Sequence, residues 1–335
     1  MKNDAFGRGQ GASPRGYERM GEGNLTVELH MPAALVSRHN SLGDEIDQDL
    51  PPYDRRQVFS VDEYDDHCPP SWTRSGFNAD LRCNELAYFA PLTLGRGLWF
   101  NMIHLAQHTH DVAIMMSMQG VNPLTSWPIE GVQLKQYRDR CPKHERSLNA
   151  DRYCPECKFK LPGQNYLAST TGRSLWLDGF RTKDGTVRQF LITDDVARGV
   201  AAQVLGDKRT SSFAFAIFES REPKPRPAYR SRVLESLGGG ELESLASPPD
   251  SMRGASRSFG ARPKSIEIAA GARIKQDAGI DPKSPDYWND RPSVVLHLNS
   301  TDEETFREIL RAGRRPEADV GPLARMSVGH FPNTG

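Results

Sequence analysis

The sequence predicts a mainly β protein: a β-sandwich-like core, α+β only at its edges, with two short helices and an inserted zinc knuckle. Three observations lead to this prediction. Short apolar runs of strand length are separated by Gly, Pro or polar residues. No regular alternation of strands and helices appears, which favours a sandwich over a parallel α/β sheet. Cysteine and histidine gather in the middle of the chain with the spacing of metal ligands.

Composition limits the classes of protein that fit. The chain has 335 residues, enough for two modest domains or one large one with insertions. Lys plus Arg and Asp plus Glu number 43 each, so no net charge attracts nucleic acid or an acidic membrane. The sequence shows no apolar run of membrane-spanning length and no secretory signal. We therefore expect a cytoplasmic protein without membrane insertion.

The chain divides into four expected segments. Residues 1–24 are rich in Gly and Arg and are predicted to form a flexible tail. Residues 25–220 should form the β-rich core. Residues 221–264 are rich in Pro, Gly and Ser, as linkers are, and residues 265–335 should form a small strand–helix unit.

In the first half, alternation of apolar and polar residues predicts the strand at 25–30, and apolar runs of β-type length between Gly, Pro or polar residues predict the others. These strands are expected at residues 25–30, 58–61, 85–94, 97–103 and 111–118. In the second half, two apolar runs flank Lys183-Asp184-Gly185, and Asp-Gly between such runs is a strong hairpin signal. Further strands are expected at residues 174–180, 186–192, 212–218, 265–268 and 294–298.

Two helices are predicted from their end signals. Residues 193–195 offer side-chain oxygens that can cap a helix, an apolar stripe follows, and Gly206 ends it. The second helix should run to about Ala312, with Thr301 or Asp302 as its cap and acidic residues in its first turn.

The clearest chemistry lies in the predicted loop 139–160. The sequence reads C-P-K-H, then nine residues, then C-P-E-C, and the four expected metal ligands are Cys141, His144, Cys154 and Cys157. Zinc prefers four such ligands in a tetrahedron, and two tight turns facing each other supply them. Because four protein ligands leave no open position for water, we expect a structural Zn²⁺ rather than a catalytic one.

Two other interpretations of this motif stay open. The pairs could be chance neighbours with exposed thiols, or two of the three cysteines could form a disulfide. A disulfide would leave one thiol over and His144 without a purpose. Cys68 and Cys83 remain outside the motif, and nothing in the sequence indicates that they pair.

Other polar groups favour structural roles. In the stretch IHLAQHTHD, His104, His108, His110 and Asp111 could bind a metal, but a polar surface strand is the favoured interpretation. Asp178, Arg188 and Gln189 flank the hairpin, where an Asp178–Arg188 pair across the strands is favoured over chemistry. A carboxylate cluster for Ca²⁺ would draw on Gln276, Asp277, Asp281 and Asp286, yet their spacing does not match an EF-hand loop. We expect turn and cap roles for this last group.

Several motifs occur in a recognisable order. They are LWF at 98–100, SMQGVNPLTS at 117–126, QNY at 164–166, LWLDGF at 175–180, GTVRQF at 185–190 and GARIKQDAGIDPKSPDYW at 271–288. Together they resemble a family of uncharacterised bacterial proteins over roughly residues 85–310. The resemblance implies no activity, cofactor or catalytic residue. Because the stretch before QNY is often shorter in that family, it implies that the metal loop is inserted between two core strands.

These observations predict a non-catalytic, zinc-stapled structural or interaction protein. It would act through protein–protein contacts, by self-association or with a protein partner in a larger assembly. Trp99, Trp127 and Trp176 could anchor such contacts, although core positions are favoured for Trp99 and Trp176. The alternative is a small-ligand-binding protein or enzyme with a pocket on the strands at 98–118 and 175–190. A third, a nucleic-acid accessory protein, is disfavoured by the net neutrality.

Overall fold

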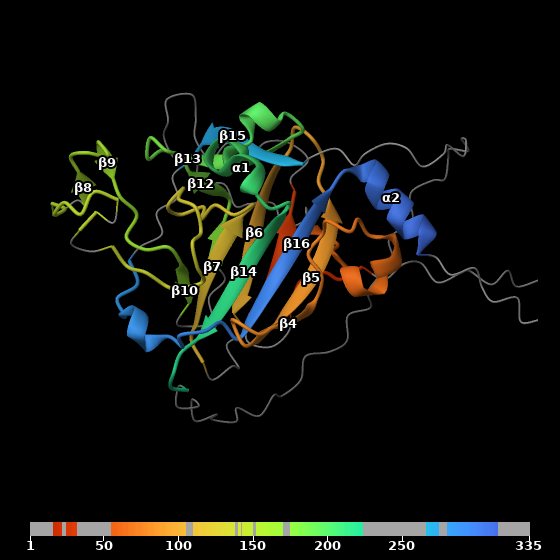
Figure 1. Ribbon diagram of the computed structural model, residues 1–335, viewed down its shortest axis with the longest axis horizontal. Helices are drawn as coiled ribbons and strands as arrows, with labels where there is room; N and C mark the ends of the chain where they lie inside the picture. Colours follow the sequence, from red (N-terminus) through yellow and green to blue (C-terminus); the bar gives the residue numbers. More distant parts are fainter. Residues whose placement is uncertain are drawn as a thin grey trace, which may run out of the picture.

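The computed structural model describes residues 16–21, 25–31, 55–104, 110–137, 140–141, 143–149, 152–169, 175–223, 266–274 and 280–313. Two seven-stranded sheets pack face to face, and two short helices lie at their periphery (Figure 1). The predicted mainly β sandwich with two short helices is therefore confirmed.

The first sheet has the strand order β12-β13-β6-β1-β2, with β11 also paired to β6 and β15 to β13. Its strands are β1 (Leu25–His30), β2 (Arg55–Arg56), β6 (Gly97–His104), β11 (Leu175–Leu177), β12 (Gly179–Arg181), β13 (Val187–Thr193) and β15 (Glu267–Arg273). All of its strand pairs are antiparallel. The hairpin predicted around Asp184 joins β12 to β13, and Gly185 takes the positive φ of 83° that its turn requires.

The second sheet has the strand order β10-β7-β14-β16-β5-β3, with β4 also paired to β5. Its strands are β3 (Phe59–Ser60), β4 (Gly76–Asn78), β5 (Cys83–Pro91), β7 (Val112–Met118), β10 (Leu167–Ser169), β14 (Ser212–Glu219) and β16 (Val294–Thr301). The pair β16–β5 is parallel, although these strands are far apart in sequence. The predicted strand at 58–61 is shortened because Val61 begins a 3₁₀ turn.

Both predicted helices form. The first is divided at Gly199 into a 3₁₀ turn (Val196–Arg198), capped by Asp195, and α1 (Val200–Leu205). The second is α2 (Glu303–Ala312), in which the Asp302 side chain accepts from two amides of the first turn. Among the residues that the structure describes, no helix is long and apolar enough to cross a membrane.

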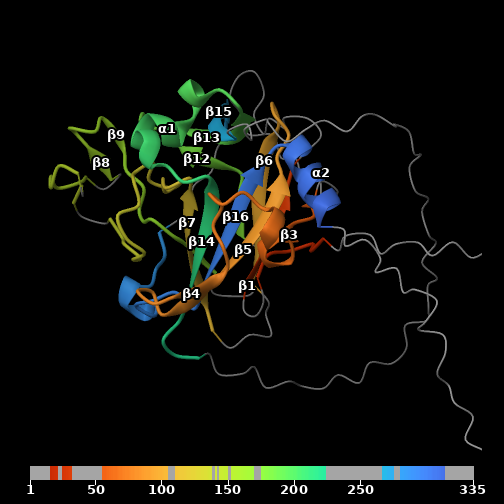
Figure 2. The same ribbon diagram turned by 45° about the vertical axis from the view of Figure 1, so that its right-hand side comes forward.

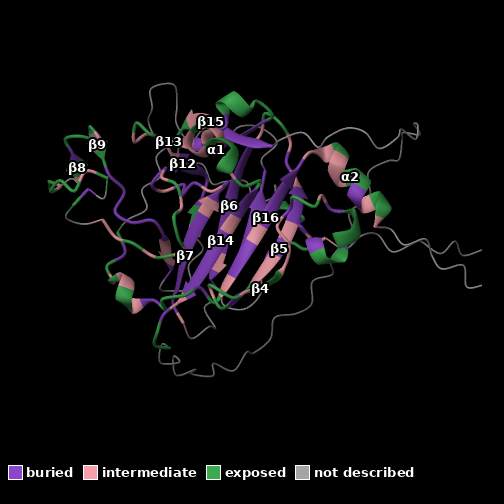
Figure 3. Cartoon of the chain, viewed as in Figure 1, coloured by how far each residue is buried: buried purple, intermediate pink, exposed green. Residues whose placement is uncertain are grey.

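The second sheet is covered on both faces. Its inner face packs against the first sheet in the main apolar core (Figure 3). On the outer face, one apolar cluster forms around Phe89 beneath α2, and another forms around Trp288 and Tyr166. Burial on both faces explains why β7 and β14 read as nearly continuous apolar runs.

Chain segments outside the expected core also contribute to it. Met20 is 0% exposed and pairs with Val27, so residues 16–21 of the expected tail belong to the fold. Strands β15 and β16, from the expected C-terminal unit, are members of the two sheets. Most of the expected linker 221–264 lies outside the described residues. The division into four segments itself stays a prediction.

The WLDGF motif sits where the first sheet branches. β6 and β13 pair with each other only near Leu98. Beyond that point the run Leu175–Arg181 lies between them: its first part, β11, pairs with β6, and its second part, β12, pairs with β13. Asp178 lies at the bend between β11 and β12, and its carbonyl accepts from the Phe190 amide (3.3 Å). At Gly179, any Cβ would lie far inside van der Waals contact with the Arg188 carbonyl. The motif therefore needs glycine at this position.

We expect Gly179→Ala to destabilise the protein by about 1–3 kcal/mol, because the added methyl forces β12 away from β13. Urea unfolding followed by circular dichroism measures the loss. Gly76→Ala on β4 is the matched control, since its Cβ would meet open space, and its expected effect is within about 0.5 kcal/mol. Equal stability of the two variants would contradict the close approach described at the branch.

Candidate metal centre

The metal-binding motif lies on an arm inserted between two neighbouring strands at one edge of the second sheet. The chain leaves this sheet after β7 and returns to it at β10, the edge strand that pairs with β7. In two views the hairpin of β8 (Tyr153–Cys154) and β9 (Phe159–Lys160) stands beyond the sheets (Figures 1 and 2). We call residues 133–166 the metal arm. The predicted insertion between two core strands is confirmed.

Hydrogen bonds between its outgoing and returning chains hold the base of the arm. The Tyr137 amide donates to the Gly163 carbonyl (2.7 Å), and the Asn165 amide donates to the Lys135 carbonyl (3.1 Å). The Asn165 side chain also accepts from the Lys135 amide (2.8 Å) and donates to the Gln133 carbonyl (2.9 Å). These bonds position the tip of the arm relative to the sandwich.

The two halves of the motif are built alike. Arg140 bridges to Ser147 around the first pair of ligands, and Tyr153 pairs with Lys160 around the second. Each bridge encloses the same number of residues. The motif is therefore a pair of matching knuckles that face each other.

The same backbone turn closes both knuckles. The Glu145 amide donates to the Cys141 carbonyl (2.7 Å), and the Lys158 amide donates to the Cys154 carbonyl (2.8 Å). Glu145 and Lys158 both adopt positive φ values, 54° and 60°. Such values are uncommon outside glycine, so the ligand geometry is maintained against a local preference of the chain.

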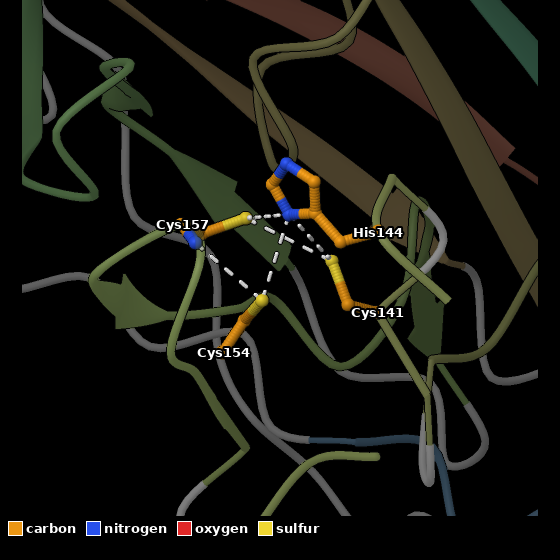
Figure 4. Close-up of side chains that lie close together, drawn as sticks. All are labelled: Cys141, His144, Cys154 and Cys157. Atoms are coloured by element: carbon orange, nitrogen blue, oxygen red, sulfur yellow. Dashed lines mark hydrogen bonds between the residues drawn. The ribbon is translucent and has the colours of Figure 1, made fainter. Parts of the chain in front are cut away.

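The four predicted ligands converge on one point (Figure 4). Their ligand atoms all lie within 4.8 Å of one another. The Nδ1 atom of His144 is 3.7, 3.6 and 3.3 Å from the sulfurs of Cys141, Cys154 and Cys157, and the Cys141 and Cys157 sulfurs are 3.7 Å apart. With zinc bond lengths of about 2.3 Å to sulfur and about 2.0 Å to nitrogen, a tetrahedron has edges of ~3.8 Å between sulfurs and ~3.6 Å from sulfur to nitrogen. The cluster therefore has the dimensions of a tetrahedral site that could hold a metal ion.

An apolar cluster of its own shields this site. Cys141 and Cys154 are fully buried, together with Leu161, and Trp127 and Leu148 pack against them. This cluster is separate from the main core between the sheets. A metal bound here should therefore stabilise the arm more than the sandwich.

The thiols have opposed proton affinities. Burial acts to raise the pKa of Cys154, but the Cys157 amide, the His144 ring and the Cys141 thiol bond to its sulfur and bring the pKa down to about 6. Burial and the neighbouring thiols Cys141 and Cys154 raise the pKa of Cys157 to about 12. A thiolate thus forms easily at Cys154, and its negative charge opposes a second thiolate at Cys157. A bound cation would relieve the repulsion between the two thiolates.

The other interpretations of the motif find no support in this geometry. All five cysteines are free thiols, and 3.7 Å between the Cys141 and Cys157 sulfurs is far beyond the ~2.0 Å of a disulfide. Cys68 and Cys83 are buried in two different apolar clusters, and burial raises the pKa of Cys68 to about 11. Both therefore behave as core residues.

The histidine-rich stretch serves hydrogen bonding. His104 is buried, and its Nε2 donates to the His110 carbonyl (2.9 Å) while its Nδ1 accepts from the Ser169 hydroxyl (3.2 Å). The His110 Nδ1 lies 2.9 Å from the Ser220 carbonyl. Asp111 accepts from Lys283 (3.0 Å) and Tyr287 (2.8 Å), and His108 lies outside the described residues. The favoured surface strand is wrong for His104 and Asp111, which are both buried.

The candidate residues near the hairpin occupy the first sheet. Arg188 donates to the Gly271 carbonyl (3.4 Å) on β15. Asp178 is buried at the branch, and Gln189 is buried on β13. The favoured Asp178–Arg188 pair stays a prediction.

The expected turn role of Asp281 is confirmed. Its carboxylate accepts from the Lys283 amide (3.0 Å), the Tyr166 hydroxyl (3.0 Å) and the Trp288 indole (3.0 Å). Asp286 lies in the first turn of a 3₁₀ helix (Pro285–Tyr287). Gln276 and Asp277 lie outside the described residues.

The tryptophans fall in three environments. Trp99 is buried and stacks on His30, with ring centroids 3.8 Å apart. Trp176 packs on Trp99 but is 42% exposed, so the favoured core position is confirmed for Trp99 and wrong for Trp176. Trp127 packs against the apolar cluster around the ligand cysteines, and its ring meets that of Tyr137 edge to face with the centroids 5.3 Å apart.

Comparison with known proteins supplies no function. No protein-family model, curated protein or solved structure matches this chain. The resemblance of its motifs to a bacterial family stays a prediction, and functional inference rests on the site itself.

Removal of the metal should loosen the arm and leave the sandwich folded. We expect a strong chelator to raise amide hydrogen exchange mainly at residues 140–161, because the apolar cluster around the ligands is separate from the core. Strand β14, in the middle of the second sheet, is the internal control. Exchange that rises equally in β14 would show that the arm and the sandwich unfold together.

Metal affinity should fall as the pH is lowered. At pH 7 the Cys157 thiol, with its pKa raised to about 12, must release a proton when a metal binds. One released proton corresponds to about a tenfold change in apparent affinity per pH unit, or about a hundredfold between pH 8 and pH 6. Competition with a chromophoric chelator measures this change. An affinity independent of pH would contradict thiolate ligation.

Proposed function

We propose that this protein is a non-catalytic, zinc-stapled interaction protein whose metal arm makes protein–protein contacts. The observation that carries the proposal is the closed set of four ligands with tetrahedral dimensions at the end of an inserted arm. A set of four protein ligands fills the coordination sphere, whereas a catalytic zinc keeps one position open. The metal would therefore serve to hold the arm in shape.

Zinc is the metal that suits this donor set best. Three thiolates and one imidazole form the Cys₃His combination of structural zinc sites. Soft thiolate ligands select zinc over magnesium or calcium, which prefer oxygen. With three thiolates and Zn²⁺, the site would carry one negative charge, partly offset by the hydrogen bond from the Cys157 amide to the Cys154 sulfur (3.5 Å).

The tip of the arm presents side chains suited to contacts. Tyr153 is 40% exposed on β8 and offers a partner an aromatic ring with a polar hydroxyl at its end. Arg146 and Lys158 are exposed nearby on the two knuckles. A metal staple makes such a surface rigid before binding, which lowers the entropy lost when a complex forms.

Self-association through the arm is the form of contact to test first. The purified protein should contain about one zinc per chain by elemental analysis, and light scattering should give a mass above the 37.4 kDa of one chain. Tyr153→Ser should shift the species toward the monomer with the zinc content unchanged. Phe77→Ser is the matched control, because Phe77 is 68% exposed on β4, outside the arm.

The outcomes separate the two parts of this proposal. Protein that contains no zinc, or retains it after Cys154→Ser with Cys157→Ser, would overturn the metal staple. A zinc-loaded chain that is monomeric at all concentrations and insensitive to Tyr153→Ser would overturn contact through the arm.

A further inference from the structure

A cleft lies between the metal arm and the sandwich. Its volume is about 760 Å³, within the range of small-molecule sites. Five separate parts of the chain line it: β7 at Met115, the loop 122–131 that follows β7, the arm, the hairpin turn at Lys183, and α1 at Val204. His144 and Cys157 of the metal centre form part of the same lining. The shape of the cleft thus depends on how the arm lies against the sandwich.

The lining of the cleft carries more positive than negative side chains. Lys135 and Lys143 reach it from the arm and Lys183 from the hairpin turn, and all three are exposed. Two carboxylates also line it, but Glu156 is 3.7 Å from the Arg146 guanidinium on the arm, which offsets its charge. Only Glu130 is then left against three ammonium groups, none of which forms an ion pair with a carboxylate of the described residues. The cleft therefore favours an anion.

Aromatic and apolar side chains form another part of the lining. Trp127 and Tyr137 pack edge to face at 5.3 Å. Burial raises the pKa of Tyr137 to about 12, so its hydroxyl keeps its proton at neutral pH. Met115 and Ile129 add apolar surface from the sandwich side. Flat aromatic surface beside positive charge is complementary to a planar ring that carries an acidic group.

We propose that this cleft binds a small planar aromatic anion, a ring bearing a carboxylate or a phosphate, and that the metal staple is required for the binding. Trp127 connects the two sites, because it lines the cleft and also packs against the ligand cysteines. Lys143 and Glu156 belong to the knuckles themselves, so loss of the metal displaces part of the lining. The dependence on metal rests on the proposed zinc site, whereas the ligand class rests on the cleft alone.

Binding is tested by titrating the full chain with four probes, followed by NMR chemical shifts. Benzoate and phenyl phosphate combine a ring with an anion, inorganic phosphate is the anion alone, and benzyl alcohol is the ring alone. We expect a ring with an anion to bind in the millimolar range or tighter, and more tightly than either part alone. Binding of benzoate but not phenyl phosphate would assign the ligand to the carboxylates. Binding of phenyl phosphate but not benzoate would assign it to the phosphates. No binding of either at about 10 mM would overturn the proposal.

Matched lysine variants locate the binding. Lys183→Gln should weaken it about threefold to tenfold, through loss of a charge-assisted contact. Lys208→Gln removes an exposed charge outside the lining and should change it less than twofold. Equal weakening by both variants would indicate general charge attraction and overturn the assignment to the cleft.

The requirement for metal is tested on the same samples with their zinc content measured. Chelation should abolish probe binding, and added zinc should restore it. Binding that survives chelation, or binding to a chain that never holds zinc, would overturn the metal requirement and leave the anion site standing. A chain with one zinc and no probe binding would overturn the anion site and leave the zinc staple standing.

Discussion

The buried carboxylate of Asp281 is the contact on which the position of the metal arm depends. A carboxylate taken out of water must be hydrogen-bonded, and this one accepts from Tyr166, Trp288 and the Lys283 amide. Tyr166 lies where the arm returns to β10, and Trp288 lies on the outer face of the second sheet. One buried charge thus ties the base of the arm to the sandwich.

Gln136 extends this attachment to the outgoing chain of the arm. Its side-chain amide donates to the Tyr166 hydroxyl (2.8 Å) and to the carbonyls of Asp281 (3.1 Å) and Lys283 (2.6 Å). Both chains of the arm are therefore fixed near their base, while the knuckles at the tip have only their own small apolar cluster. A bound metal would therefore stabilise the tip more than the base.

The sequence predicts local features well and long-range ones poorly. The ligand set and the hairpin at Asp184 are encoded within a few residues, so spacing and turn chemistry suffice to find them. The parallel pairing of β16 with β5 joins strands far apart in the chain, and no local sequence pattern predicts it. Trp176 faces the side of β11 opposite to the buried Leu177, and its exposure depends on what covers that face of the sheet, which no local pattern states.

Two parts of the site also escape sequence reasoning. Glu145 and Lys158 adopt positive φ without being glycine, so composition does not show that these two positions close the predicted turns. Their equal offset from Cys141 and Cys154 is the signal that could have revealed it. The cleft gathers lysines from the arm and from the hairpin turn, and their convergence depends on how the arm lies against the sandwich. A pocket of this kind is a product of tertiary structure alone.

Metal and anion, if both bind, must influence each other reciprocally. A metal that raises the affinity for an anion in the cleft by some factor requires the anion to raise the affinity for the metal by the same factor. The physical basis would be the ordering of the arm against the sandwich. The first ligand to bind would order the arm and lose conformational entropy, and the second would bind an arm that is already ordered. Lys143 and Glu156 are the residues through which this coupling would act, since each lies beside a metal ligand and in the wall of the cleft. With both ligands, the arm would be ordered by whichever of them binds first.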